Sequence, residues 1–194
     1  SEITKELASR GHSVTAIARK PDAIPAASGI TPIAGDASDP AALIALIKGS
    51  DAVISALHFD VPAETLLGAL KTAGVPRLLV TGGAASLEVA PGVLLFDTPE
   101  FPAEWKPIAK GGIDFLAHLR HEKEIDWTFF SPAALIEETP RLGRYRTGTD
   151  QLVVDANGDS KIGFSDYAIA MVDELEQSPT REAVARFNAT LQIG

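Results

Sequence analysis

The chain has 194 residues, of which 45% are hydrophobic and 22% charged, with a formal net charge of −9 at pH 7; this suits a single domain spanning residues 1–194. No apolar run approaches the roughly 20 residues of a membrane span, and a negative charge without clustered Lys and Arg excludes a typical nucleic-acid surface. The absence of cysteine excludes disulfides and thiolate sites, and with no recognisable signal peptide the expected location is cytoplasmic.

Short apolar segments alternate with helical patterns along most of the chain, which is typical of βαβ units and a parallel sheet. Helices are predicted where apolar residues recur at helical spacing between capping residues, namely in residues 1–10, from Asp39 to Gly49 and between Pro62 and Gly74. Buried strands are predicted at residues 13–18, 30–34, 52–56 and 77–81.

After Gly83 the pattern becomes irregular as far as Pro107, and so long an irregular stretch predicts a functional loop over the ligand crevice. A helix is predicted to resume near Gly112, followed by a strand at residues 127–130. The remainder, about residues 138–194, predicts a small α+β appendage on the substrate side. Its expected elements are strand-like pieces at 144–146, 152–154 and 161–164 and a helix capped by Ser165.

The first predicted helix has no strand before it, although a doubly wound sheet places its first strand centrally. We therefore expect the first strand and its glycine-rich phosphate loop to be missing from this sequence. The alternative is a smaller fold that opens with a helix. Direct pairing of strand 13–18 with strand 52–56 would support that alternative.

Six segments together resemble one family: RGHSVTAIARKP, GDASDP, SDAVISAL, RLLVTGGAASLEVAPG, DWTFFSPAALIE and KIGFSDYAIAMVDELE. With them the chain resembles the atypical short-chain dehydrogenases related to NmrA-like and to flavin or biliverdin-IXβ reductase-like proteins. The resemblance covers nearly the whole chain. It implies an α/β fold with a doubly wound parallel sheet, the NAD(P)-binding Rossmann fold, and a small-molecule substrate for a monomer or homodimer.

Arg19 and Lys20 follow the second strand of such a sheet, where dinucleotide folds contact the adenosine ribose. A guanidinium offers paired donors to a 2′-phosphate, so these residues favour NADP(H) over NAD(H). The alternative is a solvated basic turn. By resemblance, Asp36 and Ala37 lie against the adenine, although Asp36 with Gly35 is equally typical of an ordinary turn.

The fourth and sixth strands of the family sheet end at further candidate cofactor residues. Ser55, Ala56 and Leu57 should border the crevice at the carboxyl ends of the strands, and only the resemblance favours cofactor binding there over strand-end packing. By resemblance, Ser131, Pro132 and Ala133 line the nicotinamide, although a proline after a strand is also a simple breaker. His58 follows Leu57 and is left without a role.

Thr81, Gly82 and Gly83 end the fifth strand, where the larger superfamily carries a catalytic hydroxyl, and Thr81 and Ser86 are the candidates. The two glycines would let the chain turn past the nicotinamide, or form an ordinary turn. The Tyr-x-x-x-Lys of the best-known dehydrogenases is absent from its expected place. Lys106 could take over its electrostatic part, and the alternative is a solvated lysine.

These features predict an NAD(P)H-dependent reductase of a flavin, a quinone or a similar conjugated acceptor, because such acceptors tolerate the lack of a tyrosine acid. The alternative is a non-catalytic NADP-binding sensor of the NmrA-like type. A metal hydrolase is disfavoured because the four histidines show no ligand spacing with carboxylates: His12, His58, His118 and His121.

Overall fold

The computed structural model describes residues 1–177, so the part of the expected appendage in 178–194 lies outside the described residues. The helices are α1 (Glu2–Ser9), α2 (Pro40–Ile47), α3 (Ala63–Ala73), α4 (Lys106–Leu119) and α5 (Phe164–Glu176). The longer strands are β1 (Val14–Ala18), β2 (Ile30–Ala34), β3 (Ala52–Ser55), β4 (Arg77–Thr81) and β7 (Asp126–Phe130). The short strands are β5 (Glu88–Ala90), β6 (Val93–Leu94), β8 (Leu135–Glu137) and β9 (Lys161–Gly163).

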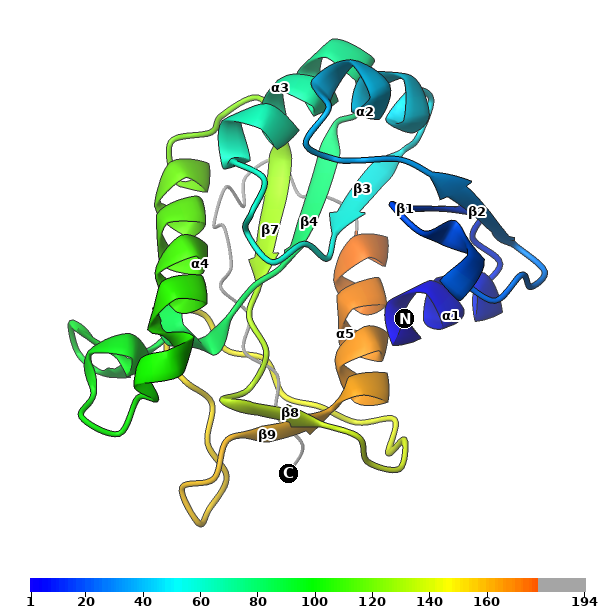
Figure 1. The fold of residues 1–194 in the computed structure, drawn as a ribbon. Coiled ribbons are helices and arrows are strands. Elements are labelled where there is room, and N and C mark those ends of the chain that lie inside the picture. Colours follow the sequence, from blue (N-terminus) through cyan, green and yellow to red (C-terminus); the bar gives the residue numbers. More distant parts are fainter. Residues whose placement is uncertain (178–194) are drawn as a thin grey trace.

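All five longer strands pair in parallel, as βαβ connections require, so the predicted α/β class is confirmed. β1 pairs with β2, and β3, β4 and β7 form a second sheet in that order (Figure 1). Within the described residues β1 does not pair with β3. The additional strand itself stays a prediction.

Successive residues of β4 and β7 face opposite sides of the sheet and pack against different helices. Leu78, Val80 and Phe129 lie in a core cluster with apolar residues of α2, α3 and α4. Leu79 and Phe130 lie in a second cluster with residues of α5 and β9. The sheet is therefore covered on both faces, as its continuous apolar strands require.

Local sequence explains where the helices begin and end. The Asp39 carboxylate accepts hydrogen bonds from the backbone N–H groups of Ala41 and Ala42 and so caps α2. Gly74 ends α3 in the left-handed conformation, with φ +74°. A Cβ at Gly35 would lie 2.5 Å from Leu46 Cδ1 and 2.7 Å from Ile17 Cγ2, so only glycine lets α2 approach β1 this closely.

The structure corrects four predicted details. α4 begins at Lys106 rather than near Gly112, because Pro107 lies in its first turn, where its missing N–H is not needed. α5 is preceded by Gly163, so Ser165 is not its cap. Residues 144–146 and 152–154 form no strand of the described sheets. β1 and β2 are only partly buried, since they form a separate two-stranded sheet.

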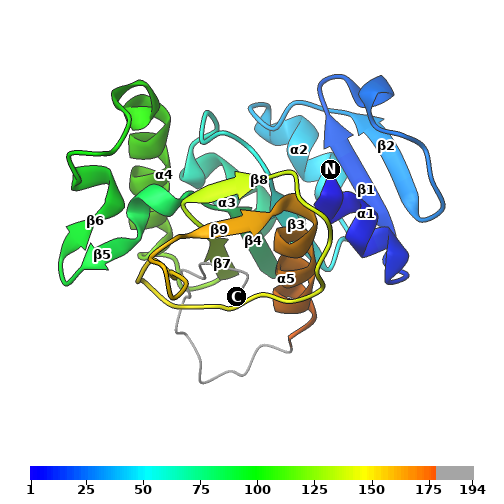
Figure 2. The same ribbon diagram turned by 90° about the horizontal axis from the view of Figure 1, so that it is seen from below.

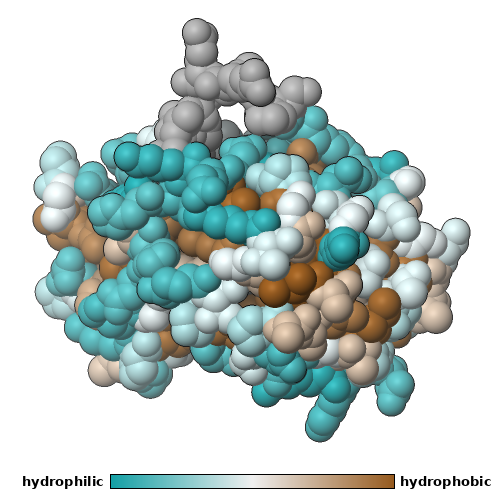
Figure 3. Space-filling view, turned by 90° about the horizontal axis from the view of Figure 1, so that it is seen from above, coloured by the Kyte–Doolittle hydropathy of each residue, from teal (hydrophilic) through white to brown (hydrophobic). Residues whose placement is uncertain are grey.

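Seen from below, β8 and β9 lie in front of the carboxyl ends of β4 and β7, with α4 to one side and α5 and α1 to the other (Figure 2). The opposite face presents hydrophilic residues interrupted by small hydrophobic patches (Figure 3). Within residues 1–177 no helix combines the length and hydropathy needed to cross a membrane.

Candidate functional site

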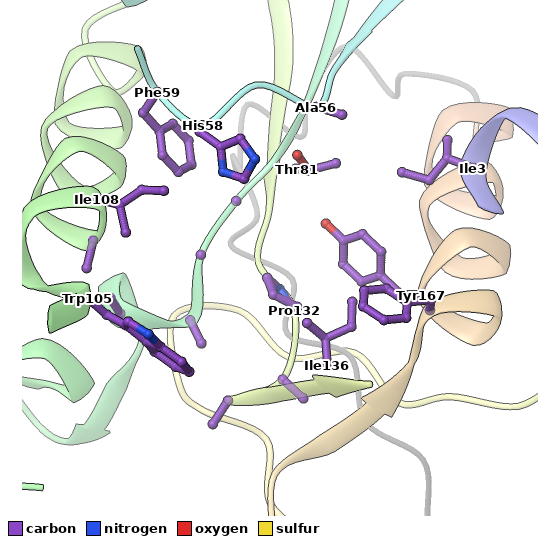
Figure 4. Close-up of a pocket in the computed structure, with 18 of the residues that line it drawn as sticks. Ile3, Ala56, His58, Phe59, Thr81, Trp105, Ile108, Pro132, Ile136 and Tyr167 are labelled. Atoms are coloured by element: carbon purple, nitrogen blue, oxygen red, sulfur yellow. The ribbon is translucent and has the colours of Figure 1, made fainter. Parts of the chain in front are cut away.

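A cavity of about 870 Å³ opens at the carboxyl ends of β3, β4 and β7 (Figure 4). This volume falls within the roughly 300–1,000 Å³ of typical small-molecule sites. Open parallel sheets bind ligands at this end, because backbone N–H groups and loop side chains converge there. The main lining residues come from strand ends, from the 84–109 segment and from the start of α5: Ala56, Leu57, His58, Phe59, Thr81, Gly82, Gly83, Leu95, Phe101, Trp105, Ile108, Pro132, Ala133, Ile136, Glu138, Thr139, Phe164 and Tyr167.

The end of β4 is held rigidly at the cavity. Thr81 Oγ1 donates a hydrogen bond to the Ser55 carbonyl oxygen at 3.2 Å, and the Gly82 N–H donates to the Phe130 carbonyl oxygen at 2.9 Å. A Cβ at Gly82 would lie 2.5 Å from the Phe129 ring, whereas one at Gly83 would meet nothing within 4 Å. Gly82 is therefore required for packing, and Gly83 leaves open space beside the cavity.

The end of β7 contributes a buried polar group. Ser131 is fully buried, and its Oγ makes no hydrogen bond within the described residues. Thr139, which lines the cavity, likewise has a buried Oγ1 without a partner there. A buried hydroxyl without a partner costs free energy, so Thr139 Oγ1 suits a ligand that supplies a hydrogen bond, whereas Ser131 does not line the cavity. Pro132 and Ala133 line the cavity directly.

An aromatic wall faces β4 across the cavity. It comes from the segment that the sequence predicts as a loop over the crevice: Leu95, Phe101 and Trp105 line the cavity, joined by Ile108 of α4. The indole of Trp105 is 54% exposed, which is unusual for so large a ring. The irregular spacing of these residues does not predict which of them face the cavity, although the segment as a whole is predicted to lie over the ligand crevice.

Tyr167 of α5 forms the opposite wall, and the sequence analysis did not assign it to the site. Its side chain is buried, and its hydroxyl donates a hydrogen bond to the Phe130 carbonyl oxygen at 2.6 Å. Burial raises the pKa of the Tyr167 phenol well above its ordinary value of 10. This tyrosine is consequently a wall residue and a poor proton donor at neutral pH.

The candidate adenosine residues lie apart from the cavity, at the carboxyl ends of β1 and β2. Arg19 and Lys20 are exposed, and neither forms an ion pair within the described residues. Asp36 Oδ1 accepts hydrogen bonds from the N–H and Oγ of Ser38, which lower the pKa of the carboxyl, as does the charge of Arg19. Ala37 packs against the main core cluster.

Two of the candidate catalytic residues do not line the cavity. Ser86 is buried, its Oγ donates to the Gly83 carbonyl oxygen at 3.2 Å, and it borders a smaller pocket beside α4. Lys106 begins α4, and its Nζ lies 5.2 Å from the centre of the Phe96 ring. Thr81 is thus the candidate catalytic residue that the structure brings to the cavity, while Ser86 and Lys106 lie beside it.

Residues 1–188 match the model of a family described as NAD(P)H-binding. The chain belongs to the NAD(P)H-binding family. It is 43% identical to protein YwnB of Bacillus subtilis (strain 168) over 187 residues, which cover 91% of this chain and 86% of that protein.

Solved structures agree with this membership. A Burkholderia pseudomallei protein described as a "putative exported protein" is 42% identical with a TM-score of 0.88, covering 99% of this chain and 93% of that one. A Streptococcus pneumoniae protein described as a "putative NADH-flavin reductase" is 34% identical with a TM-score of 0.84, covering 100% and 93%. The resemblance to flavin reductase-like NAD(P)-binding proteins is thereby confirmed.

The residues of the chain fit a nicotinamide cofactor of this family. The open flank at Gly83 and the unpartnered hydroxyl of Thr139 suit a planar ring carrying a carboxamide. Arg19 and Lys20 offer free cations to the adenosine end. The candidate site residues predicted from the sequence therefore divide into a group at the cavity and a group at the carboxyl ends of β1 and β2.

Proposed function

We propose that the protein is an NAD(P)H-dependent reductase of a flavin, a quinone or a similar conjugated acceptor. The observation that supports this most is the cavity itself: a space of about 870 Å³ with mostly apolar walls, at the ligand-binding end of a parallel sheet. A bound dihydronicotinamide would supply a hydride. The walls would hold a flat ring against it and exclude water, and Trp105, Phe101 and Ile108 line one of these walls.

The charges at the cavity narrow the class of acceptor. Among residues 1–177, no Lys or Arg side chain lines the cavity, whereas Glu2 and Glu138 do. An acceptor that carries phosphates or carboxylates would find no cation here to offset the loss of its hydration. Uncharged conjugated rings such as quinones or riboflavin therefore fit this lining better than anionic ones.

The buried tyrosine also bears on the reaction. Because the hydroxyl of Tyr167 is bonded to a carbonyl oxygen and its pKa is raised, it does not supply the proton that alcohol-forming dehydrogenases take from tyrosine. Reduction of a quinone or a flavin requires a weaker acid than reduction of an isolated carbonyl, since charge in the reduced ring is delocalised. This supports conjugated acceptors over simple ketones.

Purified protein should oxidise NADPH in the presence of menadione or riboflavin with saturation in both substrates. The control is the same mixture without acceptor. Saturable turnover supports the reductase, and FMN is expected to be a poorer substrate than riboflavin because of its phosphate. Tight NADP⁺ binding without turnover of any of these acceptors would instead identify a sensor.

We propose further that NADPH is preferred over NADH, and Arg19 carries this preference. Arg19→Asp should weaken NADPH binding roughly tenfold or more, because a charge-assisted hydrogen bond contributes about 1.5–3 kcal/mol. NADH, which lacks the phosphate, should bind almost unchanged. Titrations at fixed ionic strength would measure both affinities, since salt screens exposed charges.

Lys123→Asp is the matched control for Arg19→Asp, because it makes the same change of charge at an exposed lysine before β7, at the amino end of the sheet. If Arg19→Asp leaves the ratio of the two affinities as it is in the wild type and in Lys123→Asp, Arg19 is a solvated turn residue and the preference for NADPH is wrong.

A further inference from the structure

The turn after β3 adopts an unfavourable backbone conformation. Phe59 has φ +64°, and it is the only non-glycine residue with positive φ in the described part of the chain. The left-handed region is unfavourable for a bulky residue because its Cβ crowds the following carbonyl oxygen, so this conformation persists only where the surroundings impose it. The turn places both His58 and Phe59 at the cavity.

The surroundings of Phe59 impose the turn through its ring. The ring centre lies 5.6 Å from that of Phe115 and 5.9 Å from that of Phe129. α4 makes room at Gly112, where a Cβ would lie 3.0 Å from the Phe59 ring, closer than ordinary contact; a Cβ at Gly111 would be in ordinary contact with Phe59 Cβ at 3.5 Å. A glycine inside a helix is less favourable than alanine, so close packing against this ring is the reason for a glycine at position 112.

The anchored ring fixes the direction of the preceding side chain. The His58 imidazole projects into the cavity between Phe59 and Thr81 (Figure 4). It forms no ion pair or hydrogen bond within the described residues, whereas His12 contacts Glu176 at 2.9 Å and His118 contacts Glu64 at 3.0 Å. His58 is therefore a free imidazole at the cavity.

The other ionisable side chains at the cavity are less suited to proton donation. The hydroxyl of Tyr167 is occupied by the Phe130 carbonyl, and Glu2 pairs with Lys5 at 2.7 Å. Glu138 is an exposed carboxylate at the rim. A protonated imidazole carries a hydrogen on both ring nitrogens and can donate either one, and a neutral imidazole can take up a proton from solvent.

We propose that His58 donates the proton that accompanies hydride transfer to the acceptor, and that Phe59 and Gly112 position it. This rests on the proposed reductase function. The hydride, with its electron pair, passes from NAD(P)H to the conjugated acceptor. One N–H bond of the protonated His58 ring breaks as that hydrogen bonds to an oxygen of a quinone or to a ring nitrogen of a flavin. The products are NAD(P)⁺, the reduced acceptor and neutral His58, which takes up a proton from solvent.

The test uses menadione reduction by NADPH. His58→Gln should lower kcat by about 100-fold, the lower end for a positioned acid, with a much smaller effect on KM and on NADP⁺ affinity measured separately. His118→Gln is the matched control and should retain the wild-type kcat. In His58→Ala, added imidazole should restore part of the lost rate, which a structural role would not predict.

The positioning role is tested on α4. Gly112→Ala places a Cβ against the Phe59 ring and should lower kcat with little change in NADP⁺ affinity, and imidazole should not restore the rate because His58 is still present. Gly68→Ala in α3 is its matched control: a Cβ there meets nothing within 4 Å, so this variant should keep the wild-type kcat and raise the melting temperature slightly.

The outcomes separate the two proposals. If wild-type protein turns over and His58→Gln retains its kcat, or if imidazole fails to restore any rate to His58→Ala, the role of His58 is wrong and the reductase function stands. If wild-type protein binds NADP⁺ but reduces no acceptor, the function and the role of His58 both fail.

Discussion

The two walls of the cavity are built from different interactions. The wall formed by α4 and the turn at Phe59 is a dry aromatic and aliphatic cluster that includes Phe115 and Phe129. The wall formed by α1 and α5 is held together by charges: Arg10 contacts Glu6 at 2.9 Å, Asp173 at 2.6 Å and Glu176 at 2.8 Å. The stability that the first wall contributes should depend on the volume of its side chains, and the stability that the second contributes should depend on pH and salt concentration.

The largest effect is expected from removing an aromatic ring of the apolar wall. Phe129 is fully buried. Its ring packs against that of Phe59 and lies directly against Gly82, where it leaves no room for a Cβ. Phe129→Ala should lower the free energy of unfolding by about 3–5 kcal/mol, since a cavity remains where the ring was. Denaturant unfolding at several pH values would measure it, and the loss should be the same at each. A strongly pH-dependent loss would show that the two walls are not independent.

A smaller effect with the opposite pH behaviour is expected in the charged wall. Glu6 is buried and accepts hydrogen bonds from Arg141 at 2.5 Å and from Arg10, which together hold the pKa of its carboxyl below the ordinary 4.5. Glu6→Gln should cost about 1–3 kcal/mol at neutral pH. A carboxylate with a lowered folded pKa stabilises above its ordinary pKa, and this contribution is lost as pH falls through the folded value.

The difference in stability between wild-type protein and Glu6→Gln should therefore be full above about pH 4.5 and shrink below it. Glu124→Gln is the control, because Glu124 is an exposed partner of Lys71 and its loss should change little. A difference that stays constant down to low pH would mean that Glu6 contributes packing rather than charge.

The smallest effect on stability is expected at Tyr167, which makes both an aromatic contact and a hydrogen bond. Tyr167 packs its ring 5.5 Å from that of Phe130 while its hydroxyl donates to the Phe130 carbonyl oxygen. Tyr167→Phe keeps the ring and removes one hydrogen bond, so it should cost about 0.5–1.5 kcal/mol. Thermal unfolding would detect this as a shift of a few degrees. A cost as large as that of Phe129→Ala would mean that the hydroxyl, rather than the ring, holds this wall.

The sequence predicted the sheet end of the site and missed its walls for a physical reason. Thr81 and Gly82 could be placed because a short apolar segment between glycines predicts a buried strand that ends at Thr81. Parallel strands bring their carboxyl ends to the same edge of the sheet, where ligands bind. Trp105 and Phe101 lie in a segment without a period, so their direction depends on tertiary packing. Tyr167 has no signal in the local sequence, because nothing there shows that the start of α5 faces the cavity.

The start of α4 was missed because Pro107 was taken as the end of a loop, whereas a proline is also compatible with a first helical turn. The unusual φ of Phe59 had no sequence signal of its own, because the glycine that admits its ring, Gly112, lies on another element about 50 residues later. Whether Arg19, Lys20 and Asp36 bind the adenosine end stays a prediction.

The contact between Arg10 and Asp173 joins residues 163 positions apart, so it closes nearly the whole described chain into a loop. We expect contacts of such separation to form late in folding, after the local βα units, because closing a long loop costs conformational entropy before the contact itself contributes favourable free energy. Strengthening or weakening this ion pair should therefore change the unfolding rate more than the folding rate. The ion pair between α1 and α5 would therefore slow the unfolding of the native state. Arg10→Met should increase the unfolding rate, while refolding proceeds at nearly the wild-type rate.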